Sequence, residues 1–300
     1  MYLIFDTETT GLPKNWNAPI TDTDNWPRCV QIAWQLHDNM GVLVDHQDYL
    51  IRPDGYNIPY DSEQVHGIST ELAVEKGENL AVVLERFNEA LSRATHLVGQ
   101  NLGFDLNIMG CEYYRENLET SLDSIPVLDT CTEKTAEICQ IPGGRYGKFK
   151  LPTLTELHKE LFGEAFEEAH NATADVEATT RCFLELLRRG NYSVDELHAD
   201  SGYLEEFKEL NSGPIDLAGL KHRNLKAESK KLRERQKKTE VTDSNDSADR
   251  TVELEGASFS HLHNHSQYSI LQSTTNASDL VKAAAEQKMP AVALTDTGNM

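Results

Sequence analysis

Carboxylate side chains occur where their spacing could hold a metal ion. Asp6 and Glu8 end a short apolar run, residues 2–5, that has the length of a strand. Residues two apart on a strand project from the same face, so these carboxylates repel each other unless a cation lies between them. Hard divalent ions such as Mg²⁺ and Mn²⁺ prefer oxygen ligands of this kind. The D-x-E spacing alone is weak evidence, because it occurs at Asp6/Glu8, Asp61/Glu63 and Asp175/Glu177.

Two further acids stand near expected helix starts. Asp105 follows an apolar strand at residues 96–100 and falls in the first turn of the next helix. Asp175 follows His170 and falls at the start of another helix. The helix dipole explains an acid at either position taken singly. The ordered conjunction of four acids with one histidine is what indicates metal-dependent chemistry.

Strands and helices must bring these residues together, and the apolar pattern predicts both. Strands are expected at residues 2–6, 29–36, 42–51, 96–100 and 127–129, with Gly41 turning the second into the third. Helices are expected at residues 79–95, from residue 102, around 153–161 and at 173–189. Three strands followed by alternating helices and strands predict an α/β fold with a mixed sheet flanked by helices.

Three short motifs carry a resemblance to a known family. D-T-E-T-T-G (6–11), N-L-G-F-D (101–105) and H-N-A-T-A-D (170–175) resemble the exonuclease motifs of the DEDDh family. That family has an RNase H-like fold and includes the proofreading exonuclease of bacterial DNA polymerase III. V-H-G-I-S (65–69) is similar to a family segment beside the terminal nucleotide. The resemblance covers about residues 1–190, which we expect to form the exonuclease domain.

The resemblance implies a 3′→5′ exonuclease that hydrolyses DNA 3′ ends with two Mg²⁺ or Mn²⁺ ions, which stabilise the attacking and leaving oxygens. It implies that His170 is the general base. The implied catalytic metal ligands are Asp6, Glu8, Asp105 and Asp175. The implied substrate-binding residues are Thr7, Thr9, Leu12, His66, Asn101 and Phe104. A structural role is expected for His37, His46, His96 and His158.

The charge of the chain is strongly acidic and uneven. It has 28 Lys and Arg against 49 Asp and Glu, a net charge of −21, so general attraction to nucleic acid is excluded and bound cations must supply positive charge. Residues 221–238 hold nine Lys or Arg and two acids. They form either a solvated helix face or a phosphate-tracking segment. We expect a helical extension at 191–238 and a flexible linker at 239–255.

The last part of the chain, residues 256–300, contains a histidine cluster. H-L-H-N-H-S-Q-Y-S (261–269) and A-L-T-D-T-G-N-M (293–300) resemble the start of the PHP domain that opens the α subunit of bacterial DNA polymerase III. Gln272-Ser273 and Thr297 depart from that family's metal-binding pattern. His263 and His265 therefore form at most a vestigial metal site, which we expect to be metal-poor. A helix is expected at 279–287 and a strand at 291–296.

These expectations combine into one hypothesis. The chain is the N-terminal part of a DNA polymerase III α subunit with its own proofreading exonuclease, a fragment of a longer protein. Its partners are DNA 3′ ends and other replisome subunits, including a sliding clamp. No apolar run approaches the roughly 18 residues of a membrane helix, and the five cysteines form no C-x-x-C pair, so a cytoplasmic protein with reduced thiols is expected. The alternatives are a stand-alone nuclease acting on RNA or repair intermediates, and an inactive binding module.

Overall fold

The computed structural model of the chain describes residues 1–166, 171–245, 264–265 and 275–295, with only the backbone described at 236–245. Two compact units divide at residue 234, namely Met1–Glu234 and Arg235–Met300. The first unit therefore includes the segment 191–234 that the sequence analysis places after the exonuclease domain.

A five-stranded mixed sheet forms the centre of the first unit, with strand order β3-β2-β1-β4-β5. The strands are β1 (Tyr2–Thr9), β2 (Cys29–His37), β3 (Leu43–Leu50), β4 (His96–Gly99) and β5 (Val127–Asp129). β2 pairs antiparallel with β1 and β3, whereas β4 is parallel to β1 and β5. Gly41, at φ 86°, lies in the β2–β3 hairpin turn that the sequence predicts.

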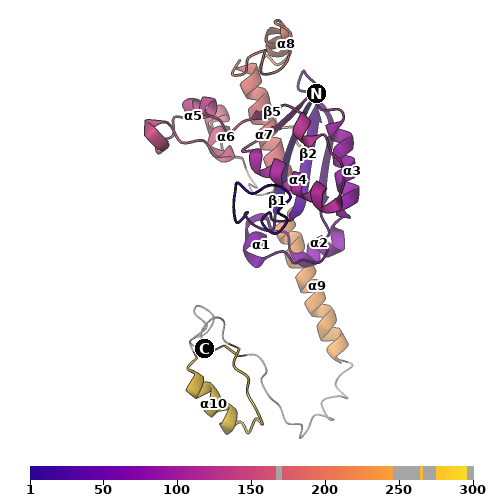
Figure 1. Ribbon diagram of the computed structural model, residues 1–300, viewed down its shortest axis with the longest axis vertical. Helices are drawn as coiled ribbons and strands as arrows, with labels where there is room; N and C mark the ends of the chain where they lie inside the picture. Colours follow the sequence, from indigo (N-terminus) through magenta and orange to yellow (C-terminus); the bar gives the residue numbers. More distant parts are fainter. Residues whose placement is uncertain (167–170, 246–263, 266–274, 296–300) are drawn as a thin grey trace. The chain divides into compact units, whose positions relative to one another are not determined.

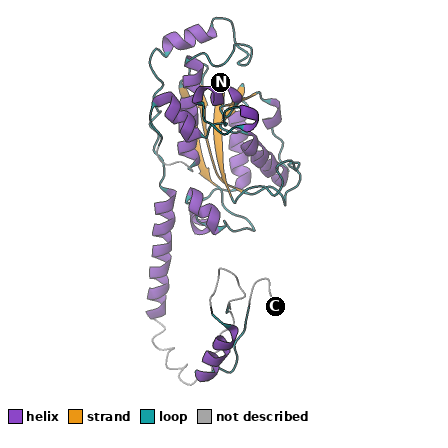
Figure 2. Ribbon diagram, turned by 90° about the vertical axis from the view of Figure 1, so that its left-hand side faces the viewer, coloured by secondary structure: helices purple, strands orange, loops and turns teal. Residues whose placement is uncertain are grey.

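Helices cover both faces of this sheet, as Figure 2 shows for the first unit. The helices before β5 are α1 (Tyr60–His66), α2 (Thr70–Lys76), α3 (Leu80–Leu91) and α4 (Gly103–Glu116). Those after it are α5 (Glu133–Cys139), α6 (Leu154–Phe162), α7 (Ala172–Arg188), α8 (Tyr203–Leu210) and α9 (Leu225–Asn245). The helix α10 (Ala277–Glu286) belongs to the second unit. Short 3₁₀ turns occupy Leu122–Ser124 and Arg145–Gly147. The predicted fold class is confirmed.

Alternation along β1 divides the core between the two faces. Leu3 and Phe5 pack with α3, and Tyr2 and Ile4 pack against Phe183 and its neighbours on α7. Asp6 and Glu8 continue the second set, so the strand aims both acids at the α7 face. α7 crosses β1 and β2 on this face (Figure 1). The pairing of β1 with β2 shifts register between Glu8 and Thr9, directly beyond the acids.

Some expectations for the later part of the chain need correction. α9 runs to Asn245, so the first residues of the expected linker 239–255 are helical, and residues 246–263 lie outside the described part. The expected helix near 279–287 is present as α10. The expected strand at 291–296 is not formed over its described residues, which hold a single bridge position at Val292. Asn264 instead contacts this stretch by hydrogen bonds with Ala293 and Thr295.

Candidate active site

Three of the predicted ligands converge at the C-terminal end of β1. One carboxylate oxygen from each of Asp6, Glu8 and Asp175 lies within 4.8 Å of the others. The strand supplies the first two, and the first turn of α7 supplies the third. All three residues are partly exposed, so an ion and a substrate can reach the oxygens. The set contains only hard oxygen donors, which fits Mg²⁺ or Mn²⁺.

Asp105 lies beside this cluster but is held differently. It is 5% exposed, and its Oδ1 accepts hydrogen bonds from the Thr7 hydroxyl at 2.6 Å and the Thr7 backbone N–H at 3.0 Å. Its charge raises the pKa of both Asp6 and Glu8, so it lies within electrostatic reach of them. One oxygen of Asp105 is thus fixed by the protein, which leaves the other for an ion or a metal-bound water.

The cluster is electrostatically costly without a cation. Burial, followed by the charges of Asp105, Asp175 and Glu8, raises the pKa of Asp6 well above its usual range. Burial and the neighbouring acids raise the pKa of Glu8 to about 8, and burial raises that of Asp105 to about 7 despite the Thr7 hydrogen bonds. Neither Asp6 nor Glu8 has an ion pair or side-chain hydrogen bond among the described residues. The like charges of Asp6 and Glu8, without a cation among the described residues, favour a bound metal ion here.

The turn that precedes α7 is anchored on both sides. Asn171 caps α7, because its side-chain oxygen accepts from the Thr173 backbone N–H at 3.1 Å. Its amide group donates to the backbone carbonyl of Arg223 at 2.9 Å. The predicted general base, His170, lies outside the described residues. The role of His170 as the general base stays a prediction. Its chain neighbour Asn171 is held in place by two hydrogen bonds.

A bridging segment, residues 219–233, connects the α7 side of the site to α1 and α2. On the α7 side the buried Glu177 accepts from the backbone N–H of Gly219 at 2.6 Å and of Leu220 at 3.3 Å, and contacts His222 Nε2 at 2.6 Å. The two acids of the D-x-E pair at 175/177 therefore have different roles. Asp175 joins the carboxylate cluster, and Glu177 holds the chain.

On the other side, the bridging segment packs against the turn that carries His66. Ser229 Oγ donates to the Gly67 carbonyl at 2.7 Å and accepts from the Ser69 N–H at 3.1 Å. A Cβ at Gly67 would lie 2.8 Å from the backbone nitrogen of Lys226. Glycine therefore allows the bridging segment to approach this turn closely. Nearby, Arg233 forms a two-pronged ion pair with Glu63. The bridging segment thus contacts both α7, which carries Asp175, and the turn after α1, which follows His66.

His66 itself is 5% exposed and points its Nδ1 at the Ile68 backbone N–H, 3.1 Å away. The bond makes Nδ1 the acceptor, so the neutral ring carries its proton on Nε2. Gly67, in a left-handed conformation at φ 79°, ends α1 directly after this histidine. The turn fixes the orientation of the ring.

The remaining predicted substrate residues fall into two groups. Thr7 and Thr9 use their hydroxyls within the protein, since Thr9 donates to the Gly11 carbonyl at 2.7 Å. Leu12 is 73% exposed, and Asn101 is exposed with a φ of 59°. Phe104 is partly buried, with its ring 5.7 Å from that of Trp16.

Sequence reasoning did not identify Trp16 or Asp129 as parts of this region. Trp16 is 55% exposed and lies against Phe104. Asp129 accepts from the backbone N–H groups of Asn101, at 2.8 Å, and Leu102, at 2.9 Å, and so fixes the turn before Asp105. The signal in the sequence was the place of Asp129 at the end of an expected strand. Because β5 is parallel to β4, and β4 is parallel to β1, these strands end at the same edge of the sheet.

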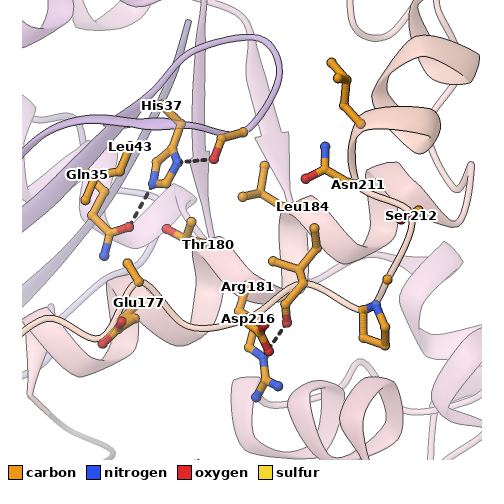
Figure 3. Close-up of a pocket in the computed structure, with 16 residues that line it drawn as sticks. Gln35, His37, Leu43, Glu177, Thr180, Arg181, Leu184, Asn211, Ser212 and Asp216 are labelled. Carbon is orange, nitrogen blue, oxygen red and sulfur yellow. Dashed lines mark hydrogen bonds between the residues drawn. The ribbon is translucent and has the colours of Figure 1, made fainter.

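A cavity of about 480 Å³ also adjoins α7, but it is separate from the carboxylate cluster. Figure 3 shows Glu177, Arg181 and Leu184 of α7 on one wall and His37 of β2 on another. None of the four predicted metal ligands lines it. His37 contacts the Gly41 carbonyl and the Gln35 side chain, and burial lowers the pKa of its ring. These contacts give His37 a structural place in the hairpin.

Among the described helices, none combines the length and apolar character needed to cross a membrane.

Comparison with known proteins agrees with this geometry. The family model described as "Exonuclease" matches residues 3–183, and the PHP domain model matches residues 261–300. The DNA polymerase III PolC-type of Streptococcus thermophilus is 33% identical over 181 residues, which are 60% of this chain and 11% of that protein. The PolC-type enzyme of Streptococcus sanguinis is 28% identical over 226 residues, 75% of this chain and 13% of that protein. The aligned part thus spans about a tenth of these relatives.

Solved structures share the fold. The zinc-bound complex of E. coli ExoI with single-stranded DNA has a TM-score of 0.50 at 22% identity, covering 63% of this chain and 40% of that one. The complex of E. coli Exonuclease I with a dT13 oligonucleotide also has a TM-score of 0.50, at 21% identity, covering 66% of this chain and 45% of that one. The RNase H-like exonuclease fold is therefore established. The chain belongs to the exonuclease family and carries PHP-domain sequence at residues 261–300.

Proposed function

We propose that this chain is a 3′→5′ exonuclease that removes nucleotides from DNA 3′ ends with two divalent ions. The observation that carries the proposal is the convergence of Asp6, Glu8 and Asp175, whose oxygens lie within 4.8 Å of one another. Asp105, held by Thr7, completes the donor set. An inactive binding module would gain nothing from a half-buried cluster of like charges.

The residues have distinct roles in the proposed reaction. Asp6, Glu8, Asp105 and Asp175 would hold Mg²⁺ or Mn²⁺ through hard oxygen ligands. When bound, such ions polarise the scissile phosphate and favour the attacking hydroxide and the leaving oxygen. Thr7 fixes the carboxylate of Asp105, and the Gly67 turn fixes the ring of His66. His170 takes the proton from the attacking water.

We also propose that the activity serves proofreading within a PolC-type DNA polymerase III. The supporting observations are the identity with two PolC-type enzymes and the PHP-domain match downstream of the exonuclease. A covalent connection raises the effective concentration of the nuclease near a primer end. Replisome partners, including a sliding clamp, belong to this proposal, as does a cytoplasmic location.

A trimming assay tests the nuclease. A 5′-labelled single-stranded DNA should shorten from its 3′ end with Mg²⁺ or Mn²⁺ and remain intact with EDTA. Asp6→Ala and His170→Ala should abolish shortening and leave the circular dichroism spectrum unchanged. Asp61→Ala is the matched control, because Asp61 belongs to another D-x-E pair and is exposed. Shortening that persists in the purified Asp6→Ala/His170→Ala double variant would reject the assignment. An RNA strand of the same sequence, trimmed faster than the DNA, would favour the alternative RNA nuclease.

A further inference from the structure

A glycine-rich loop between α5 and α6 differs in charge from the rest of the chain. Between Glu137 and Glu156 the sequence has three cations, Arg145, Lys148 and Lys150, and no acid, although the whole chain has 49 acids against 28 Lys and Arg. Tyr146 and Phe149 alternate with these cations, which puts aromatic rings and positive charge together. We call residues 141–152 the Tyr146 loop.

The loop has a defined shape. The Lys150 N–H donates to the Ile141 carbonyl at 2.8 Å and closes its base, and the Lys148 N–H donates to the Arg145 carbonyl at 3.2 Å. A Cβ at Gly144 would lie 2.2 Å from the Phe149 carbonyl oxygen. Only glycine therefore lets the backbone at residue 144 approach the backbone at residue 149 this closely. The fold thus holds the cations and rings in a fixed relation to one another.

The loop presents its aromatic side chain to solvent in a strained conformation. Tyr146 has a φ of 57° and a ψ of 33°, in the left-handed region that disfavours residues with a Cβ. Its side chain is fully exposed, with a relative accessibility of 101%, and Phe149 is 42% exposed. A ring that gains no burial from this conformation has a free face for a ligand.

A cavity of about 720 Å³ lies between the loop and α5. Tyr146, Phe149 and Leu151 contribute apolar walls. The cations are Arg145, Lys148 and Lys150, and the opposite wall is formed by Glu133, Ala136 and Glu137 of α5. This volume is in the range of pockets that hold small organic groups, such as a nucleobase with its sugar. The combination of apolar faces with a cation matches the two parts of a nucleotide.

The cations of the loop are available to a phosphate. Arg145 makes no ion pair among the described residues. Lys148 pairs with Glu133, but the two side chains are 61% and 71% exposed, and Lys150 pairs with Glu156 with 43% and 34% exposure. Exposed pairs of this kind contribute little stability, so a phosphate group can replace the carboxylate at small cost.

The base of the loop is connected to the site of the acids. The Pro152 carbonyl accepts from Gln100 Nε2 at 2.8 Å and from the Cys131 thiol at 3.6 Å. Gln100 precedes the turn that carries Asp105, and Asp129 holds that turn. Because β1, β4 and β5 are parallel, their C-terminal ends share one edge of the sheet, and this stem lies at that edge.

We propose that the Tyr146 loop binds the single-stranded part of the substrate, with Tyr146 and Phe149 stacking on bases and Arg145 binding a phosphate. The proposal rests on the proposed nuclease function. Unpaired bases offer free faces to aromatic rings, whereas the bases of a duplex are stacked on each other. In a chain of net charge −21, the three cations of the loop offset part of the general repulsion of a nucleic acid.

Binding of 5′-fluorescein-labelled (dT)16, measured by anisotropy in EDTA, tests the loop without hydrolysis. Tyr146→Ala should weaken binding about tenfold, whereas Tyr146→Phe should retain the affinity of the wild type because it keeps the ring face. Arg145→Ala should weaken binding and reduce the slope of log affinity against log salt by about 0.7. Tyr114→Ala and Arg93→Ala are matched controls, because both side chains are exposed elsewhere on the first unit. All these positions are at the surface, so the variants should fold.

The outcomes separate the loop from the nuclease. If Tyr146→Ala binds (dT)16 as tightly as the wild type, the loop proposal is overturned, whether or not the protein trims DNA. If the wild type fails to trim DNA with Mg²⁺ or Mn²⁺ while Tyr146→Ala still loses binding, the proposed nuclease function fails, and the loop remains a binding site for single-stranded DNA that serves no nuclease. An equal loss for a blunt 16-base-pair duplex would overturn the stacking role, since paired bases have no free face. Photocrosslinking of a 5-iododeoxyuridine strand to Tyr146 or Phe149 would support it directly.

Discussion

Two sets of buried or half-buried acids in the first unit are treated in opposite ways. Glu112 has no exposed side-chain surface, and it accepts from Arg28 at 3.0 Å, from the Cys29 N–H at 2.8 Å and pairs with Arg115 at 3.2 Å. Glu185 is equally buried and is neutralised by Arg188 at 2.6 Å and Arg189 at 2.7 Å. Each of these acids has its cations on the chain.

The acids at the end of β1 have no such partners. Asp6 and Glu8 pair with no cation in the described residues, and their pKa values are raised where that of Glu185 is lowered. The contrast shows that burial alone does not make an acid functional. Glu112 and Glu185 are neutralised by arginines of the fold, whereas the like charges of Asp6 and Glu8 disfavour each other unless a cation binds.

The largest difference should appear in activity. Glu8→Gln keeps the shape of the side chain but removes a charge from the ion's shell, so kcat should fall on the order of 10²–10³-fold. Glu112→Gln should leave kcat per folded molecule unchanged, because Glu112 touches no residue of the cluster. Trimming rates, corrected for the folded fraction by circular dichroism, measure both. A fall in kcat of similar size for Glu112→Gln would remove the distinction between the two sets.

The free energy of unfolding should show the reverse order, with a loss for a variant of Glu185 and a gain for a variant of Asp6. Glu185→Gln leaves Arg188 and Arg189 without their anionic partner, and because both guanidinium groups reach solvent, the loss should be about 1–3 kcal/mol of unfolding free energy. Asp6→Asn relieves repulsion, so the metal-free protein should become more stable. Urea unfolding in EDTA measures both changes. A destabilised Asp6→Asn protein would show that Asp6 is held by stabilising contacts and is not under electrostatic strain.

The pH dependence of stability should expose the cluster as well. The folded-state pKa values of Glu8, about 8, and Asp105, about 7, exceed the ordinary values of 4.5 and 3.8. The folded protein therefore binds more protons than the unfolded chain, and the free energy of unfolding falls as pH rises from about 4 to about 8. Mg²⁺ should restore stability mainly at the high-pH end, because the ion takes the place of the protons. Unfolding at pH 5 and pH 8, with EDTA or Mg²⁺, measures the slope, which Glu8→Gln should reduce. An unchanged slope in that variant would contradict the assignment.

The smallest effect concerns the bridging segment. Gly67→Ala adds a Cβ 2.8 Å from the backbone nitrogen of Lys226, and the φ of 79° adds backbone strain. Gly55→Ala is the matched control, since it has a φ of 71° but no atom within 4 Å of the new Cβ. Both should lose about 1 kcal/mol from strain, but only Gly67→Ala should speed tryptic cleavage in the bridging segment. Equal cleavage rates in the two variants would mean that the close approach does not hold the segment.

The fold and the site differ in how far the sequence predicts them. The strands, the hairpin and the long helices follow from apolar periodicity, and acids at the end of an apolar strand are visible in the sequence. α1 and α2 were not predicted, because helices of seven residues with mixed polarity leave no clear period. Asp105 was expected as a ligand, but its hydrogen bonds to Thr7 depend on how α4 packs against β1.

The three D-x-E pairs show the same limit. One supplies Asp6 and Glu8 to the cluster, and another supplies Asp175. The pair at 61/63 supplies Glu63 to Arg233 of α9, 170 residues later in the chain. Spacing alone does not separate these outcomes, because each depends on a partner that is distant in sequence. The basic segment shows this too, since Leu225 and Leu232 are buried among its charges in one core cluster with Leu72 of α2.

The bridging segment also determines where mechanical load is borne. Up to residue 235, where the description of side chains ends, its last contacts with α1 and α2 are the buried Leu232 and the half-exposed Arg233, just before the boundary at residue 234. Tension applied to the chain beyond that point must first peel these contacts from α1 and α2 before it reaches Glu177 and the helix that carries Asp175. A pull on the downstream chain therefore reaches the carboxylate cluster only after these contacts have broken.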